Sequence, residues 1–293
     1  MTLITLLIVL MLEQYLKVSA VLENEFKSHK WFPAWRQWLS TKVDINKVND
    51  WVALALIIGT PVAVLYILSG LDYGFIFWVV QLVLAVVVMI YCLGPIDQNA
   101  HLKQYFEAVE RDDLQGAYHH VSDYLDLKSN HQVPDDISSL GRLVTRVILS
   151  QSNFRYFGVL MYFVLLGPAG ALLYRLAGSF EFSVRDDENS AYQEKLRQLR
   201  MVLDWLPARL TGFLYSLAGD FTGAMPRLKQ YLFTEQSDNE RLLEETGLGA
   251  LGIKEEHCTD IIDENKQALD LVTRTVVVFL VIIAVLTVFG WLS

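Results

Sequence analysis

Five ionisable side chains lie in otherwise apolar sequence, and four of them are the first candidates for chemistry. The fifth, Arg274, enters a terminal apolar run and can extend its charged end to the cytoplasmic interface. Glu13 follows an N-terminal apolar run, Arg175 directly follows another, and Asp204 and Arg209 flank Pro207. Because a charge is costly to bury in apolar surroundings, such a residue usually has a bound partner or a functional task. We assign no catalytic residue, but we expect ligand-binding or polar-cavity residues at Glu13, Arg175, Asp204 and Arg209.

The same residues also have a purely structural interpretation. Glu13 and Lys17 stand four residues apart and can pair on one face of a helix. Asp204 can pair in a similar way with a nearby arginine. Structural ion-pair networks perturb charged groups much as functional sites do, so residue types alone do not choose between a site and a helix-locking network.

Other motifs that carry chemistry are missing or have unsuitable spacing. The segment TGLGALG contains Gly247, Gly249 and Gly252, but it lacks the lysine and the spacing of a phosphate-binding loop. It is more typical of a helix terminator. His119 and His120 are adjacent in sequence, so they lie on different faces of a helix and cannot form a paired metal-ligand set. We therefore expect no metal and no cofactor.

Long charge-free runs predict the helices that must position these residues. The chain has 293 residues, of which 53% are hydrophobic. The charge-free runs are 1–12, 51–71, 73–94, 156–174 and 275–293. Runs of about 20 apolar residues can cross a hydrocarbon core of about 30 Å as helices. They exclude a wholly soluble protein, and also an outer-membrane barrel, whose strands alternate apolar and polar residues.

The run 156–174 is interrupted near its middle by Gly167, Pro168 and Gly170. Broken backbone at membrane depth survives only where protein or a water-filled cavity satisfies its polar groups. Either this run and 202–219 both cross the membrane, or both are re-entrant or packed inside the protein. Basic residues in the intervening loop favour the second arrangement. We predict an all-α, polytopic integral membrane protein with broken or re-entrant helices and a cytoplasmic helical part.

The distribution of basic residues predicts the orientation. Lysine and arginine in short loops stay on the cytoplasmic side. None of the 24 lies in 1–12, in the turn at Asp72 or after Thr275, whereas the segments 13–50, 95–155 and 175–274 contain all of them. We therefore expect a multi-pass protein with both termini outside and most of its polar mass in the cytoplasm. The net charge of −9 argues against nucleic acid as a partner.

Hydrophobic periodicity and caps divide the chain into five parts. A polar helix from Ala100 to Arg111 is expected, then another from Leu114, and a third that begins after Asp136. The predicted parts are three N-terminal transmembrane helices in 1–94 with a cytoplasmic loop at 23–50, a cytoplasmic helical segment at 95–155, a broken or re-entrant core at 156–222, a second cytoplasmic helical segment at 223–270 and a terminal transmembrane helix at 271–293.

Two sequence blocks resemble a known membrane-protein superfamily. LLGPAGALLYRL at 165–176 and DWLPARLTGFLYSLAGD at 204–220 are similar to the shared signature of the CobD/CbiB and AmpE proteins. The segment YFEAVERDDLQGAYHHVSDYL resembles a cytoplasmic helical segment of the same superfamily. Within it, the sequence looks like the AmpE branch.

That resemblance implies a function. AmpE-like proteins are inner-membrane proteins that modulate β-lactamase induction, an antibiotic-resistance response linked to peptidoglycan recycling. The implied role is binding of a ligand or a cell-wall-recycling partner. Membrane lipid is a further partner, and the small residues Gly59, Ala63, Gly70 and Gly74 would allow helices of a homodimer to approach closely. The alternative is a CobD/CbiB-like enzyme that uses ATP to form an amide with a changed substrate. Several polar blocks of those ligases are replaced here, for example by LEQYLKVSAVLENEF, so we expect no corrinoid ligase activity.

Overall fold

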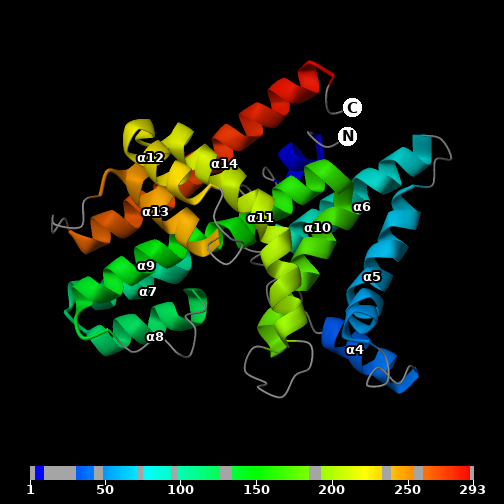
Figure 1. Cartoon of the computed structure of the whole chain (residues 1–293), viewed down its shortest axis with the longest axis horizontal. Coiled ribbons are helices and arrows are strands. Elements are labelled where there is room, and N and C mark those ends of the chain that lie inside the picture. Colours follow the sequence, from blue (N-terminus) through cyan, green and yellow to red (C-terminus); the bar gives the residue numbers. More distant parts are fainter. Residues whose placement is uncertain are drawn as a thin grey trace. The chain divides into compact units, whose positions relative to one another are not determined.

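The protein is all-helical wherever its structure is described. The computed structural model describes residues 4–9, 31–42, 49–70, 75–93, 98–125, 134–184, 193–232, 239–253 and 260–290. Every regular element in these ranges is a helix (Figure 1). This confirms the predicted fold class. Glu13 and Lys17 lie outside the described residues.

The described helices have the following order along the chain. After a helical stretch at 4–9 come α4 (Trp31–Lys42), α5 (Asp50–Ser69), α6 (Phe75–Leu93), α7 (Gln98–Glu110), α8 (Leu114–Leu125), α9 (Ile137–Ser152), the π-helix η2 (Asn153–Phe157), α10 (Gly158–Val184), α11 (Gln193–Ala218), α12 (Phe221–Tyr231), α13 (Asn239–Leu251) and α14 (Ile261–Val288).

Three helical stretches in the described part of the chain are long and apolar enough to cross a membrane. They are Asp50–Ser69, Ile137–Phe180 and Ile261–Val288, and Trp78–Leu93 is a shorter apolar helix. With a rise of about 1.5 Å per residue, the 20 residues of α5 match the thickness of a hydrocarbon core of about 30 Å. Each of the three stretches overlaps one of the charge-free runs, so the chain is a membrane protein.

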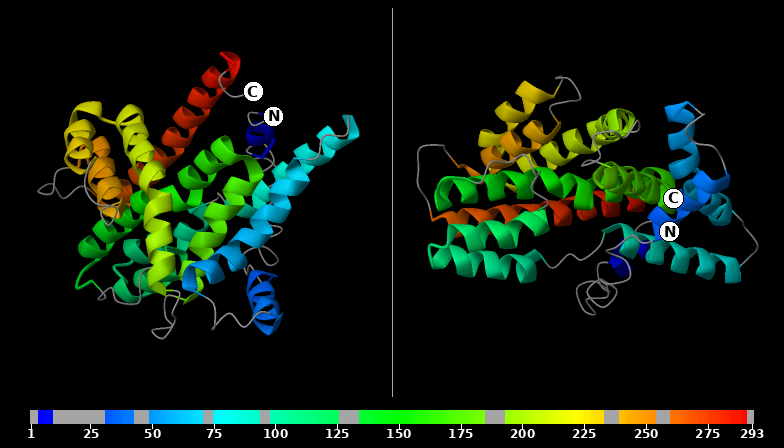
Figure 2. Two further views of the ribbon diagram at one scale, coloured as in Figure 1. Left: turned by 45° about the vertical axis from the view of Figure 1, so that its right-hand side comes forward. Right: turned by 90° about the horizontal axis from the view of Figure 1, so that it is seen from below.

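The described residues form two compact units. The first comprises Met1–Ile96, Gly158–Asp204 and Ala284–Ser293, and in it α5 and α6 both pack against α10. The second comprises Asp97–Phe157 and Trp205–Ile283. There α7 packs against α8 and α12 against α13 (Figure 2). The five parts expected from the sequence separate membrane from cytoplasmic segments, whereas these two units are defined by contacts. The five-part division therefore stays a prediction.

Helix α9 begins directly after Asp136, the N-cap residue expected from the sequence. The Asp136 side chain accepts a hydrogen bond from the backbone N–H of Ser139, as expected of an N-cap. Leu140, Val144 and Ile148 then recur at helical spacing and are all buried. Helix α9 continues through η2 into α10 without a loop, although the sequence predicted a polar helix and a separate apolar run.

Helix α10 turns back on itself at Gly167. This residue has φ 68° and ψ −159°, a conformation that is essentially restricted to glycine. Beyond the break, Tyr174 returns to Gly158, where a Cβ atom would lie 2.2 Å from the Tyr174 Cζ atom. In one straight helix these residues would stand about 24 Å apart. Helix α10 is therefore a hairpin of two arms, 158–166 and 168–184 (Figure 1).

The structure corrects two expectations about helix ends. Gly247 and Gly249 lie inside α13, and only Gly252, with φ 68°, follows its end. The two inner glycines allow close packing, since a Cβ at Gly247 would lie 2.8 Å from Leu149 and one at Gly249 2.6 Å from the Gly223 carbonyl oxygen. Helix α11 also begins at Gln193, before the apolar segment at 202–219, so the polar residues that precede this segment belong to the same helix.

Candidate functional site

A cluster of polar side chains joins the α10 hairpin to α11 within the first unit. The Tyr174 hydroxyl donates a hydrogen bond to Asp204 Oδ1. Arg200 lies one helical turn before Asp204, and its Nε donates to Asp204 Oδ2 at 2.9 Å. The side chains of Arg200 and Asp204 are each only 15% exposed. Asp204 therefore has a cationic and a neutral donor, which satisfy its charge inside the protein.

Tyr162 completes this cluster from the other arm of the hairpin. Its ring stacks on that of Tyr174 with a centroid distance of 5.3 Å and an interplanar angle of 23°. Its hydroxyl donates to the Leu203 carbonyl oxygen at 3.0 Å. The Arg200 guanidinium lies 5.5 Å from the Tyr174 ring centroid, a cation–π distance. We call Tyr162, Tyr174, Arg200 and Asp204 the hairpin cluster.

The hairpin cluster depends on glycines as much as on polar residues. Gly158 leaves the space that the Tyr174 ring occupies, and a Cβ at Gly170 would lie 2.5 Å from the Tyr162 carbonyl oxygen. The two arms approach closely because these positions have no side chain. The break at Gly167 and the small residues on either side of it therefore place Tyr162 and Tyr174 in contact.

Arg175 follows Tyr174 but lies in a different environment. Consecutive helical residues point in different directions, and the Arg175 guanidinium lies near Tyr91 and Cys92 of α6. Tyr91 accepts a hydrogen bond from Trp31 Nε1 at 2.9 Å, which ties α4 to the same region. Arg175 is thus adjacent in sequence to the hairpin cluster but interacts with another helix.

Arg209 bonds to both described ends of the connection between α12 and α13 in the second unit. Its guanidinium donates to the carbonyl oxygens of Leu232 and Trp205 at 3.1 and 3.0 Å and to Asn239 Oδ1 at 2.6 Å. It also lies 4.5 Å from the Trp205 ring centroid, and the residue is 7% exposed. Leu232 follows α12 and Asn239 begins α13, so Arg209 holds both ends of that connection.

The sequence-based candidates therefore do not form one group. Asp204 and Arg209 both lie on α11, but they belong to different compact units and have separate partners. The pairing of Asp204 with a nearby arginine is present, as the structural interpretation expected. Ligand binding by Arg175, Asp204 or Arg209 stays a prediction, and Glu13 lies outside the described residues.

The charged residues of the hairpin cluster were easier to predict from the sequence than the tyrosines that contact them. The spacing of four between Arg200 and Asp204 was a usable signal for their ion pair. No sequence signal pointed to Tyr162 or Tyr174, because their contact depends on the reversal at Gly167. Asn153 was not among the predicted site residues. It lies in η2, and its side-chain oxygen accepts a hydrogen bond from the Thr211 hydroxyl at 3.2 Å.

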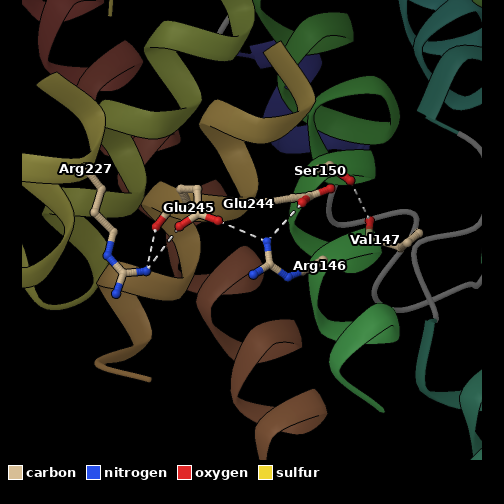
Figure 3. Close-up of polar contacts among 6 residues, drawn as sticks. All are labelled: Arg146, Val147, Ser150, Arg227, Glu244 and Glu245. Atoms are coloured by element: carbon tan, nitrogen blue, oxygen red, sulfur yellow. Dashed lines mark hydrogen bonds and ion pairs between the residues drawn. The ribbon is translucent and has the colours of Figure 1, made fainter. Parts of the chain in front are cut away.

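A second charged cluster joins three helices of the second unit. Arg146 of α9 donates to Glu244 and Glu245 of α13 at 3.3 and 3.0 Å, and Arg227 of α12 lies 3.6 Å from Glu245 (Figure 3). Burial raises the pKa of the Glu244 carboxyl above its usual range, although the hydrogen bond from Arg146 opposes this. The alternation of charges ties α9, α12 and α13 together.

Metal chemistry has no support in the described part of the chain. No group of three or more histidine, cysteine, aspartate or glutamate side chains there could hold a metal ion. His119 and His120 are both exposed, with ring centroids 6.0 Å apart. The charged residues of the two clusters are instead bonded to one another and to backbone carbonyls.

The fold and the hairpin cluster define a class of protein: an all-helical, polytopic membrane protein with a helical hairpin broken at a glycine. The chain belongs to the AmpE family, because the family model described as "Regulatory signalling modulator protein AmpE" matches residues 1–293. Of the two signature blocks noted in the sequence, 165–176 contains the break at Gly167 and the beginning of the second arm, and 204–220 covers the second half of α11.

Comparison with curated proteins agrees with this family. The chain is 23% identical over 299 residues to "Protein AmpE" of Shigella flexneri, with 99% of each protein covered. It is 24% identical to a "Cobalamin biosynthesis protein CobD" of Chromobacterium violaceum, over 59% of this chain and 55% of that protein. A CobD protein of Stutzerimonas stutzeri is 25% identical over 58% of this chain and 56% of its own length. No solved structure matches.

Proposed function

We propose that this protein is a regulator in the bacterial inner membrane that modulates β-lactamase induction in response to cell-wall recycling. It does so by binding a ligand or a partner protein of that pathway. The observation that carries the proposal is the match of the whole chain to a family described as regulatory signalling modulators. Membrane lipid and a second copy of the chain are further partners of the proposed regulator, whose polar mass is mostly cytoplasmic.

The bonding of the charged residues favours binding over catalysis. An enzyme that uses ATP needs cationic groups that can bind phosphates as charge develops. Arg209 donates to three protein acceptors, and Arg200 is paired with Asp204. Hydrogen bonds to charged groups contribute about 1.5–3 kcal/mol each, so using either side chain as a phosphate clamp would first require breaking contacts that hold the fold.

The experiment is deletion of the gene in its host, followed by measurement of β-lactamase activity with several inducers. We expect the induced level to change on deletion and to return when the wild-type gene is supplied in trans. No change with any inducer, while the protein is shown to be present in the wild-type membrane, would contradict the regulatory proposal.

The alternative function is an amide-forming, ATP-using membrane enzyme with a changed substrate. The observation in its favour is the similarity of more than half of the chain to the CobD proteins. Purified protein supplied with ATP, aminopropanol phosphate and a corrinoid acid tests this alternative. We expect no amide; amide formation that Asp204→Ala abolishes would support the enzyme and contradict the binding proposal.

A further inference from the structure

Helix α11 presents an apolar face that no described part of the chain covers. Trp205, Leu206, Phe213 and Leu217 are 40%, 48%, 42% and 45% exposed. Their spacing places them within about 120° of one another around a helix that turns about 100° per residue. We call these four residues the α11 apolar face. All of them belong to the second compact unit.

The charged residue within this part of α11 points away from that face. Between Trp205 and Gly219 the chain has one ionisable cation, Arg209, and no acidic residue. Arg209 is 7% exposed, and its guanidinium is bonded to acceptors of the same unit. The exposed surface along these 15 residues, about 22 Å of helix, is therefore apolar and aromatic.

Ring contacts place this face at the level of a membrane-crossing helix. The Phe157 ring contacts that of Tyr215 in α11 at 6.2 Å and that of Phe279 in α14 at 6.4 Å, both edge to face. Phe279 lies in the charge-free half of α14, one of the helices able to span a membrane. Phe213 and Leu217, two residues to either side of Tyr215, therefore share the depth of that half.

The exposed surface of α14 has the same apolar character. Val277 and Val281 flank Phe279 and are 54% and 56% exposed. Exposed branched residues on a membrane-crossing helix face lipid, because acyl chains are as apolar as the side chains. A second copy of the protein fits the α11 apolar face less well, since helices that associate within membranes use small residues to approach closely, and this face consists of large ones.

We infer that the α11 apolar face contacts the acyl chains of the bilayer, so that the second half of α11 is embedded in the membrane. The mean hydropathy of this part of α11 does not reveal the lipid contact, because it includes the charged residues Asp204 and Arg209. Both side chains are bonded inside the protein and do not face lipid. The inference concerns how the protein sits in lipid, and it does not depend on the regulatory proposal.

Spin labelling in liposomes tests this contact. Nitroxides are attached to Phe213→Cys and Leu217→Cys, and their collision rates with oxygen and with a water-soluble nickel chelate are compared. Cys92 is fully buried, so the background needs only Cys258→Ser. A sample of that background without an introduced cysteine measures any residual labelling.

Two reference positions calibrate the result. Val281→Cys in α14 represents lipid, and Lys229→Cys, exposed on α12, represents water. We expect both α11 labels to match Val281, with oxygen access high and nickel access low. Nickel access equal to that at Lys229 would overturn the inference. Low access to both reagents, with dipolar broadening between labels on neighbouring copies, would assign the face to a dimer interface and would overturn it as well.

Discussion

Replacing Gly167 by alanine perturbs the reversal of α10 without introducing a clash. A Cβ atom at this position has no heavy atom within 4 Å, so the added methyl group meets open space. The effect must come from the backbone, because φ 68° with ψ −159° is a conformation that alanine rarely adopts. Gly59→Ala in α5 is the matched control, since its Cβ also has no neighbour within 4 Å.

The two variants should change the free energy of unfolding in opposite directions. Holding a residue other than glycine in such a region costs about 1–3 kcal/mol. Alanine within a regular helix is more favourable than glycine by roughly 0.5–1 kcal/mol, so Gly59→Ala should stabilise the protein. The two variants should therefore differ by roughly 1.5–4 kcal/mol in the free energy of unfolding. At about 2–4 °C per kcal/mol for domains of 150–250 residues, the difference is measurable.

The assay is thermal unfolding of both variants in one detergent at one scan rate, followed by near-ultraviolet circular dichroism. Membrane proteins often unfold irreversibly, so the comparison uses midpoints under identical conditions. We expect Gly167→Ala to melt below the wild type and Gly59→Ala at or above it. Equal midpoints for the two variants would refute the reasoning that the Gly167 backbone forces the hairpin.

Four further predictions concern three other contacts and the orientation in the membrane. Gly158→Ala should cost about 1–3 kcal/mol by overpacking against Tyr174, and the additional change Tyr174→Ala should remove that penalty in a double-mutant cycle of thermal midpoints. Arg209→Leu should cost on the order of 1–3 kcal/mol for each buried acceptor that it leaves unpaired, whereas Arg197→Leu, in an exposed ion pair, should have little effect on the midpoint. Hydrogen bonds from the Thr222 hydroxyl and the Gly223 amide lower the pKa of Asp220. The stability that this N-cap contributes should therefore persist above about pH 4 and be lost as the pH falls through the lowered pKa. Asp220→Asn should weaken this pH dependence of the thermal midpoint. A reporter after Ser293 should indicate the periplasm, and Ser190→Cys should react with an impermeant reagent only after the membrane is opened; the reverse pattern would contradict the orientation.

The membrane helices were predictable because their signal is local. The charge-free runs at 51–71 and 275–293 coincide with α5 and the second half of α14. The start of α9 was also predictable, because a cap needs only Asp136 and the next three residues. Gly167 and Pro168 correctly indicated a break, since both disfavour a continuous backbone ladder.

The direction of the chain after that break was not predictable from local signals. It depends on Tyr174 fitting into the space at Gly158, two positions separated by 16 residues. The roles of Gly247 and Gly249 were misread for the same reason, since a glycine that ends a helix and one that admits a neighbouring chain look alike in sequence. The ion pair of Arg200 with Asp204 is the exception, because helical spacing alone reveals it.

We propose that this chain modulates β-lactamase induction through binding rather than catalysis, and we expect this role to require the intact hairpin cluster. Complementation of the deletion strain by Asp204→Asn tests it most directly, because the change removes the charge that pairs with Arg200 at 15% exposure. Glu194→Gln is the matched control, since Glu194 pairs with Arg197 on the same helix but both side chains are more than half exposed.

Induced β-lactamase activity is measured with each variant at equal membrane abundance. We expect Glu194→Gln to restore the wild-type level of induction and Asp204→Asn to fail to restore it. Full restoration by Asp204→Asn would contradict the proposal that the hairpin cluster is needed for regulation.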